Sequence, residues 1–241
     1  MLIINNHNIY KLLHIPKLMN TILLLKQLDL YPLFTEKDVF KLTKTTKKYV
    51  RTLLSRLLKK GYIYRIERGK YSLYDDPLIF SSHLTKPSYL SLWTALRYHN
   101  LTQQQPQAIY VMVQKSKKKI QLKNATIHFI VTKHFFGYKT ERYRDFDIQV
   151  ADPEKAIIDS LLAHLPLSYI IEAIELLDSP QKLAHYALKT KNSSLVKRVG
   201  YLLEKYKNSS FGLTYQDYNY IHLDYHHKKN GKKDKKWKLI L

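Results

Sequence analysis

The sequence predicts an α+β fold, in which an N-terminal helical module closed by a β-hairpin precedes a second domain with a small, mainly antiparallel sheet and several helices. Three observations lead to this prediction. Apolar residues recur at helical spacing over residues 16–60 and again after residue 152. Alternating runs rich in β-branched and aromatic residues occupy residues 62–74 and 108–151. Positive charge is concentrated at the N-terminal end, where residues 1–75 hold 15 Lys and Arg against 5 Asp and Glu.

Composition limits the possible functions. The chain has 241 residues, of which 45% are hydrophobic, so it can bury an ordinary core. The absence of cysteine excludes disulfides, cysteine-based zinc sites and thiol nucleophiles. No apolar run approaches the roughly 18 residues that span a bilayer, and the first 20 residues lack the pattern of a signal peptide. We therefore expect a cytoplasmic protein without a membrane partner.

The net charge of +22 is unevenly distributed. Residues 151–225 hold 8 basic against 9 acidic residues, whereas the N-terminal block and residues 226–241 are strongly basic. A polyanionic partner is therefore expected at the N-terminus. The middle of the chain, where residues 76–150 hold 11 basic against 4 acidic residues, and the tail are further candidates. The alternative is that a lysine-rich composition serves only solubility, which is the better interpretation of the tail. The predicted boundaries are 1–76 for the first domain, 77–225 for the second and 226–241 for a basic tail.

Two helices open the first domain. The first is predicted from Pro16 or Lys17 to Asp29, with an apolar face formed by Leu18, Ile22, Leu25 and Leu28. Pro32 interrupts the pattern. A short second helix then begins after Thr35, which has a capping-box spacing to Asp38.

A third helix combines an apolar and a basic face. Thr45 or Thr46 is suited to its N-cap and Gly61 to its end. The apolar stripe consists of Val50, Leu53, Leu54, Leu57 and Leu58. The opposite face carries Lys44, Lys47, Lys48, Arg51 and Ser55. A recognition helix that enters the DNA major groove needs this division between a core face and a basic face.

A β-hairpin follows, because the period changes to two in residues 62–66 and 70–74 on either side of Glu67-Arg68-Gly69-Lys70. The order short helix, basic helix, glycine and basic hairpin predicts a winged helix-turn-helix that binds double-stranded DNA. A winged helix used for protein contacts is the alternative. The predicted DNA-binding residues are Lys44, Thr46, Lys47, Lys48, Arg51, Ser55, Arg65, Arg68 and Lys70.

The second domain is predicted to begin with a short helix over 77–86 and a longer one that starts at Pro87 with Ser88 as its cap. Strands are expected at 108–113, 119–122, 125–132 and 146–151. A helix should start at Pro153, with Asp152 as cap and Glu154 complementing the helix dipole. Further helices are expected at 168–178, 180–190 and 193–206. The tail from Tyr215 is expected to be loosely held.

Three motifs in this order resemble the AbiEi-type antitoxins and transcriptional regulators of type IV toxin–antitoxin systems. The resemblance covers residues 20–165. It rests on Gly69-Lys70-Tyr71 in the hairpin, on Pro87, Ser88, Tyr89, Ser91, Ala95, Leu96 and His99, and on Val150, Pro153, Glu154, Lys155, Ala156 and Asp159. It implies a repressor that binds operator repeats in its own operon, and a second domain that neutralises a nucleotidyltransferase-like toxin, with or without direct contact.

No convincing catalytic set is present, so we expect no enzymatic activity, no cofactor and no metal site. The alternative is a metal-dependent nuclease that uses Asp145, Asp147 and Glu154, although capping explains Glu154 and Lys155 better. A third possibility is a protein whose C-terminal helices bind the toxin directly. Stacking of single-stranded bases is a further option for four tyrosines, but half-buried strand positions explain them better. These are Tyr98, Tyr110, Tyr138 and Tyr143.

Overall fold

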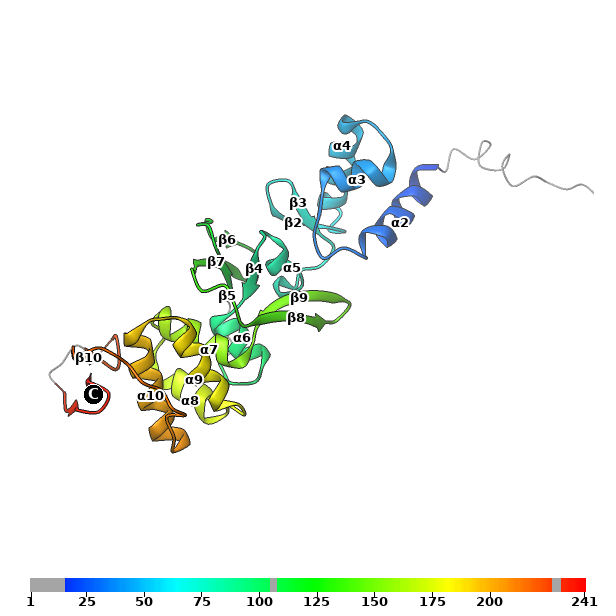
Figure 1. Cartoon of the computed structure of the whole chain (residues 1–241). Coiled ribbons are helices and arrows are strands. Elements are labelled where there is room, and N and C mark those ends of the chain that lie inside the picture. Colours follow the sequence, from blue (N-terminus) through cyan, green and yellow to red (C-terminus); the bar gives the residue numbers. More distant parts are fainter. Residues whose placement is uncertain (1–15, 105–107, 227–230) are drawn as a thin grey trace, which may run out of the picture. The chain divides into compact units, whose positions relative to one another are not determined.

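The computed structural model describes residues 16–104, 108–226 and 231–241, and the side chains from residue 21 onward (Figure 1). The chain divides into two units between Leu84 and Thr85. The division lies eight residues after the predicted boundary at residue 76. The fold is mixed α+β, as predicted. Within the described residues, no helix combines the length and the apolarity needed to cross a membrane.

The described residues of unit 1 form three main helices, α2 (Pro16–Leu28), α3 (Glu36–Thr43) and α4 (Lys47–Lys59). The Asp38 carboxylate accepts a hydrogen bond from the backbone N–H of Thr35 at 2.8 Å, which confirms the predicted cap of α3. Thr46 caps α4, because its hydroxyl oxygen accepts from the backbone N–H of Tyr49 at 3.3 Å. Gly61 adopts a φ of +71°, so the chain turns there without steric cost.

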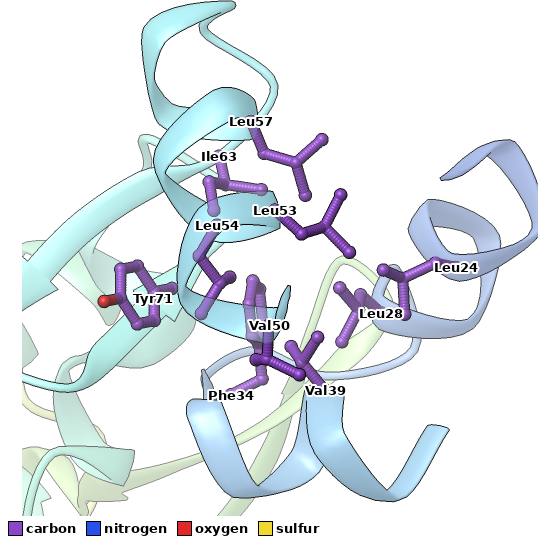
Figure 2. Packing of buried hydrophobic residues seen from close by; sticks show 10 residues of the cluster. All are labelled: Leu24, Leu28, Phe34, Val39, Val50, Leu53, Leu54, Leu57, Ile63 and Tyr71. Carbon is purple, nitrogen blue, oxygen red and sulfur yellow. The ribbon is translucent and has the colours of Figure 1, made fainter. Parts of the chain in front are cut away.

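The apolar faces of these helices meet in one core (Figure 2). The predicted stripe of α4 is confirmed, with Leu58 only partly buried. The predicted face of α2 is wrong at Ile22, which is 55% exposed, whereas Leu24 is buried in its place. Leu18 lies outside the described side chains. The buried cluster consists of Leu24, Leu28, Phe34, Val39, Val50, Leu53, Leu54, Leu57, Ile63 and Tyr71.

A three-stranded antiparallel sheet completes the core of unit 1, in the order β1 (Phe34–Thr35), β3 (Lys70–Ser72) and β2 (Tyr64–Glu67). The predicted hairpin is confirmed: Glu67 pairs with Lys70, and Gly69 has a φ of +78° in the turn between them. The pattern did not predict β1, which is only two residues long and follows Pro32. A short helix, α5 (Pro77–Phe80), and a 3-10 turn (Ser81–His83) then end the unit.

Unit 2 is built on a six-stranded mixed sheet in the order β6-β7-β5-β4-β9-β8. The strands are β4 (Ser88–Leu90), β5 (Ala108–Val113), β6 (Ile120–Gln121), β7 (Thr126–Val131), β8 (Tyr138–Tyr143) and β9 (Phe146–Ala151). The pairings β4·β5, β6·β7 and β8·β9 are antiparallel, and β5·β7 and β4·β9 are parallel. The sheet is therefore mainly antiparallel, as predicted.

The predicted helix start at Pro87 is wrong. Ser88–Leu90 form strand β4 at the centre of the sheet, and helix α6 (Leu92–Tyr98) begins only after Ser91. Tyr89 and Leu90 are both fully buried there. Because successive side chains of a strand point to opposite faces of a sheet, both faces of β4 are covered. Period alone cannot distinguish such a short buried strand from the first turn of a helix. Strand β8 was also not predicted.

Four helices follow the sheet and pack on one another: α7 (Pro153–Leu162), α8 (Leu167–Glu175), α9 (Pro180–Lys189) and α10 (Ser193–Lys207) (Figure 1). All four were predicted within a few residues of their bounds. Helix α7 also packs against α6 and β9, so it connects the helical part of the unit to the sheet.

The described residues after α10, 208–226 and 231–241, include buried and hydrogen-bonded side chains, so the prediction of a loosely held tail is wrong for them. Strands β10 (Ile221–His222), β12 (Leu239–Ile240) and β11 (Lys233–Asp234) form a small sheet. Trp237 is 2% exposed and donates a hydrogen bond to Glu204 of α10 at 2.7 Å. Lys197 and Arg198, both buried on α10, donate hydrogen bonds to residues 217–225. The buried Lys197 and Arg198 of α10 and the buried Trp237 thus hold this segment against α10.

Candidate nucleic-acid interface

The outward face of α4 carries the basic residues that the sequence predicted. Lys47, Lys48, Arg51 and Ser55 are exposed, whereas Val50, Leu53 and Leu54 of the same helix belong to the core of unit 1. Lys44 is exposed just before the helix, at the C-cap of α3, and Thr46 is the N-cap. The hydroxyl oxygen of Thr46 is therefore already used in capping. The first turns of α4 present cations to solvent, as a recognition helix requires.

A groove lies between the N-terminal half of α4, the start of α3 and the β2–β3 hairpin. Its volume is about 670 Å³. Four of its lining residues are cations, from three elements, and one is an acid. The lining consists of Thr35, Glu36, Lys37, Arg51, Arg65, Arg68, Gly69 and Tyr71. Three predicted DNA-binding residues, Arg51, Arg65 and Arg68, are thus brought together although they come from different elements.

Arg51 makes a defined contact in this groove. Its Nε atom donates a hydrogen bond to the carboxylate of Glu36 at 3.3 Å, while 69% of the Arg51 side chain stays exposed. This contact uses the Nε edge of the guanidinium, and no hydrogen bond of its two terminal nitrogens occurs within the described residues. In arginine side chains that read DNA, the guanidinium nitrogens form the fork that binds guanine O6 and N7.

The hairpin contributes two exposed arginines, but its lysine has another role. Arg65 on β2 and Arg68 in the turn are exposed. Lys70 was predicted to contact DNA from the hairpin tip. The structure instead places it half-buried, in an ion pair with Glu67 at 2.9 Å and donating to the backbone carbonyl of Leu84. Lys70 thus holds the hairpin to the end of unit 1.

The sequence analysis missed Glu36 and Lys37, which complete the groove. Both belong to the first turn of α3, 14 or more residues before Arg51 in the chain. Their role depends on the packing of α3 against α4, which no local pattern reveals. The only available signal was that charged residues follow a capping threonine.

Unit 2 holds a buried polar network built from two of the motifs that carry the family resemblance. Lys155 donates hydrogen bonds to the Asp159 carboxylate and to the Tyr89 hydroxyl, the latter at 2.9 Å. Asp159 also accepts from Tyr89 at 3.1 Å and from Ser91 at 2.8 Å. All four side chains are buried. The network connects strand β4 and the residue after it to helix α7.

Burial shifts the pKa values of three groups in this network. Desolvation raises the pKa of Asp159 and lowers that of Lys155, and the attraction between the two groups opposes both shifts. Burial and the neighbouring Asp159 raise the pKa of Tyr89 above its usual range. The prediction that Lys155 belongs to a helix cap is therefore wrong, because its ammonium lies inside the unit under the ring of Phe136.

A second charged cluster lies at the start of α7. Lys182 forms ion pairs with Asp152 and Glu154, both at 3.0 Å, and the Tyr186 hydroxyl donates to Asp152 at 2.8 Å. Burial would raise the Asp152 pKa, but the hydrogen bonds from Lys182 and Tyr186 outweigh it and lower that pKa. Asp152 is the N-cap residue as predicted, yet its carboxylate binds these side chains instead of the backbone of α7.

The acidic residues of the nuclease alternative are not gathered around a common point. Asp147 is exposed and pairs with Arg142 at 3.2 Å, and Glu154 is buried in the ion pair with Lys182. In the described part of the chain, no group of three or more His, Asp and Glu side chains is arranged to hold a metal ion.

The four tyrosines considered for base stacking are half-buried, and their rings contact other residues. Tyr138 stacks on the buried Tyr89 with ring centroids 4.6 Å apart, and Tyr110 stacks on His128 at 5.3 Å. Tyr98 and Tyr143 lie beside each other at 6.4 Å. These contacts agree with the structural interpretation. His99 is likewise structural, since its Nε2 lies 2.7 Å from the carbonyl oxygen of Ala151.

Comparison with known proteins adds no family assignment. No family model matches the chain, and no curated protein matches it.

Proposed function

We propose that unit 1 is a winged helix-turn-helix that binds double-stranded DNA. In this assignment α4 is the recognition helix and the β2–β3 hairpin is the wing. The observation that carries the proposal is the groove in which Arg51 of α4 meets Arg65 and Arg68 of the hairpin. A recognition helix and a wing contact one duplex together, so their cations must face a common space.

The residues divide into two roles. Lys47, Lys48 and Arg51 project from the N-terminal half of α4, where side chains reach base edges in the major groove. Arg65 and Arg68 are placed for phosphate contacts or for the minor groove. Arg51 is the best candidate for reading sequence, because arginine binds guanine in a bidentate geometry. A contact of this kind contributes about 1–3 kcal/mol of discrimination between bases.

Selection from a pool of randomised duplexes with the full chain tests this proposal. We expect one sequence to be enriched. With Arg51→Ala, the enriched sequence should lose its preference at one or two positions while the others persist, because only one base contact is removed. If the wild-type chain enriches no sequence, and binds duplexes no better than other polyanions, the proposal fails.

The resemblance to AbiEi-type antitoxins supports a more specific role, that of an autorepressor whose unit 2 neutralises a nucleotidyltransferase-like toxin. Residues of two resembling motifs, Tyr89 and Ser91 in one and Lys155 and Asp159 in the other, interact in one buried network. The two motifs are distant in sequence but form one network. This is expected if the chain shares its fold with the family that it resembles.

Co-expression with the product of the neighbouring gene tests the antitoxin role. We expect that product to arrest growth when expressed alone and the full chain to relieve the arrest. The triple variant Arg51→Ala, Arg65→Ala, Arg68→Ala should still relieve it, because the groove belongs to the DNA-binding unit. Failure of the wild-type chain to protect cells from a toxic neighbour would contradict this role and leave the DNA-binding proposal standing.

A further inference from the structure

A second concentration of positive charge lies in unit 2, on the six-stranded sheet. Nine consecutive positions, 115–123, contain five lysines and no acidic residue. Four lysines precede β6 and one follows it, in the turn that leads to β7. Four of the five are exposed: Lys115, Lys118, Lys119 and Lys123. We call these four residues the lysine edge.

The lysine-edge residues have no acidic partner among the described residues, in contrast to three exposed or half-buried lysines elsewhere in unit 2. Lys139 pairs with Glu141, Lys182 with Asp152 and Glu154, and Lys236 with Glu204. In the described part of the chain, none of the lysine-edge residues makes an ion pair. Like charges this close together repel one another, and binding of a polyanion relieves the repulsion.

The strand register fixes where the segment with most of these lysines begins and ends. Strand β5 ends at Val113, beside Val131 of β7, and β6 begins at Ile120, beside Ile127 on the other side of β7. Residues 114–119, which include Lys115, Lys118 and Lys119, therefore connect the level of Val131 to that of Ile127. Four residue steps along a strand cover about 13 Å, which corresponds to roughly four nucleotide steps of one DNA strand. The two ends of the segment are thus separated along β7 by a length comparable to a few nucleotides of a sugar-phosphate backbone.

One ring contact holds the middle of residues 114–119 on the sheet. The Lys117 ammonium lies over the ring of Phe129 of β7, 5.2 Å from the ring centroid. The nearby Tyr110 ring is stacked on His128, so one of its faces is already occupied and it does not serve as a platform for a base. Recognition at this edge relies on charge and is independent of base sequence.

We propose that the lysine edge is a second nucleic-acid site, which binds the phosphodiester backbone without sequence preference. It is separate from the groove of unit 1 and does not depend on the proposed function of that unit. Phosphate contacts of this kind supply most of the affinity in nonspecific binding and make it strongly dependent on salt.

Protection of a sheet edge is an alternative explanation for these exposed lysines. Strand β6 pairs only with residues 126 and 127, so the outer edge of β7 beyond Ile127 lacks a ladder partner within the described residues. Lysines on such an edge also prevent pairing with another chain. Glutamate would serve that protective purpose equally well, because it is charged too, but it would repel a phosphate backbone. Charge reversal therefore distinguishes the two explanations.

The experiment compares the full chain with Lys115→Glu, Lys118→Glu, Lys119→Glu. The probes are a single-stranded DNA of arbitrary sequence and the corresponding duplex, each titrated over a series of salt concentrations. We expect at least a tenfold loss of affinity at low salt. The slope of log affinity against log salt should fall by about 0.7 per lost contact for the single strand and about 0.9 for the duplex. The larger loss identifies which form the edge prefers.

The matched control is Lys189→Glu, Lys191→Glu, Lys205→Glu, which changes the net charge equally at exposed positions of the helical part. Both variants should stay monodisperse in light scattering. An equal effect of the two variants, or no effect of either, would overturn the proposal. Aggregation of the lysine-edge variant with unchanged binding would also overturn it and would assign the lysines to edge protection. A groove variant that loses sequence preference but keeps this binding would show that the two sites are independent.

Discussion

A single ion pair in unit 1 determines how the main candidate for base reading is presented. Glu36 holds the Nε edge of Arg51 and forms no hydrogen bond with the terminal nitrogens. Glu36 is the only acid among the residues that line the groove, so it also lowers the positive potential there. A carboxylate in this position orients the Arg51 side chain but weakens the attraction of the groove for DNA phosphates. Such an exchange is expected of a site that discriminates between sequences.

Replacing Glu36 by alanine should therefore have two opposite effects. Binding to arbitrary duplexes should strengthen because one negative charge is removed, whereas discrimination between the selected and arbitrary sequences should fall because Arg51 loses its orientation. In an Arg51→Ala background, Glu36→Ala should leave discrimination unchanged. Fluorescence anisotropy on the two duplexes measures both quantities.

The control for this prediction is Glu175→Ala, which removes an exposed acid from α8. It should leave discrimination at the wild-type value. If Glu36→Ala and Glu175→Ala have the same effect, Glu36 acts only through the overall charge and does not position Arg51.

The buried network of unit 2 leads to a prediction about stability. Lys155→Met leaves the Asp159 carboxylate buried without its counter-ion, and Asp159→Leu leaves the ammonium unpaired, so each should cost about 3–5 kcal/mol. The double variant Lys155→Met, Asp159→Leu buries no charge, and its loss should be smaller than the sum of the two single losses. Urea unfolding of the full chain, followed by far-UV circular dichroism, gives the three values. Strictly additive losses would mean that the two groups do not act as a pair.

At the scale of elements, the α4 helix and the hairpin could be predicted because their determinants are local. The Thr46 cap, the spacing of the leucines and the Arg68-Gly69 turn lie within a few residues of the structures that they form. Strand β4 could not be predicted, because its three residues become a strand only through pairing with β5 and β9. The same limit applies to Lys155 and Asp159. Their spacing of four residues on α7 was visible, but their burial depends on β4.

The docking of the C-terminal segment depends on a glycine that the sequence analysis did not single out. Gly200 of α10 faces the ring of Trp237, and a Cβ atom there would lie 2.1 Å from the ring. Gly200→Ala should displace Trp237 and separate the last strands from α10. Glycine in a helix normally costs stability relative to alanine, so its presence here reflects this contact.

Tryptophan fluorescence detects that displacement. The chain has two tryptophans, so a Trp93→Phe background leaves Trp237 as the only reporter. We expect emission to shift to longer wavelength in Gly200→Ala, because the indole becomes exposed to water. The control Leu188→Ala changes an exposed position on α9 and should leave the emission unchanged. An unchanged spectrum in Gly200→Ala would show that the segment tolerates the extra methyl group and is not held by this contact.

At the scale of the whole molecule, the two proposed nucleic-acid sites differ in their charges. The groove of unit 1 combines cations from three elements around one acid, an arrangement that suits discrimination between sequences. The lysine edge of unit 2 has no acid and suits contact with a backbone alone. Other basic residues contribute to the structure: Lys70 holds the hairpin, and Lys236 pairs with Glu204.

The distribution of charge along the sequence predicted the first of these sites but not its composition. Residues 1–75 were correctly singled out as strongly basic. Counting charges could not distinguish Arg51, which is exposed in a groove, from Lys70, which is half-buried and paired. That distinction depends on where β3 packs, and only the tertiary structure supplies it.

The central claim, that the groove of unit 1 binds duplex DNA, is tested most directly by the salt dependence of duplex binding. The full chain is compared with Arg51→Ala, Arg65→Ala, Arg68→Ala, and with Lys189→Ala, Lys191→Ala, Lys205→Ala as the control of equal charge. We predict that the groove variant loses most of its affinity for the selected duplex and that its slope falls by about 0.9 for each phosphate contact removed, whereas the control stays close to wild type. Equal affinities and equal slopes for the two variants would contradict the claim.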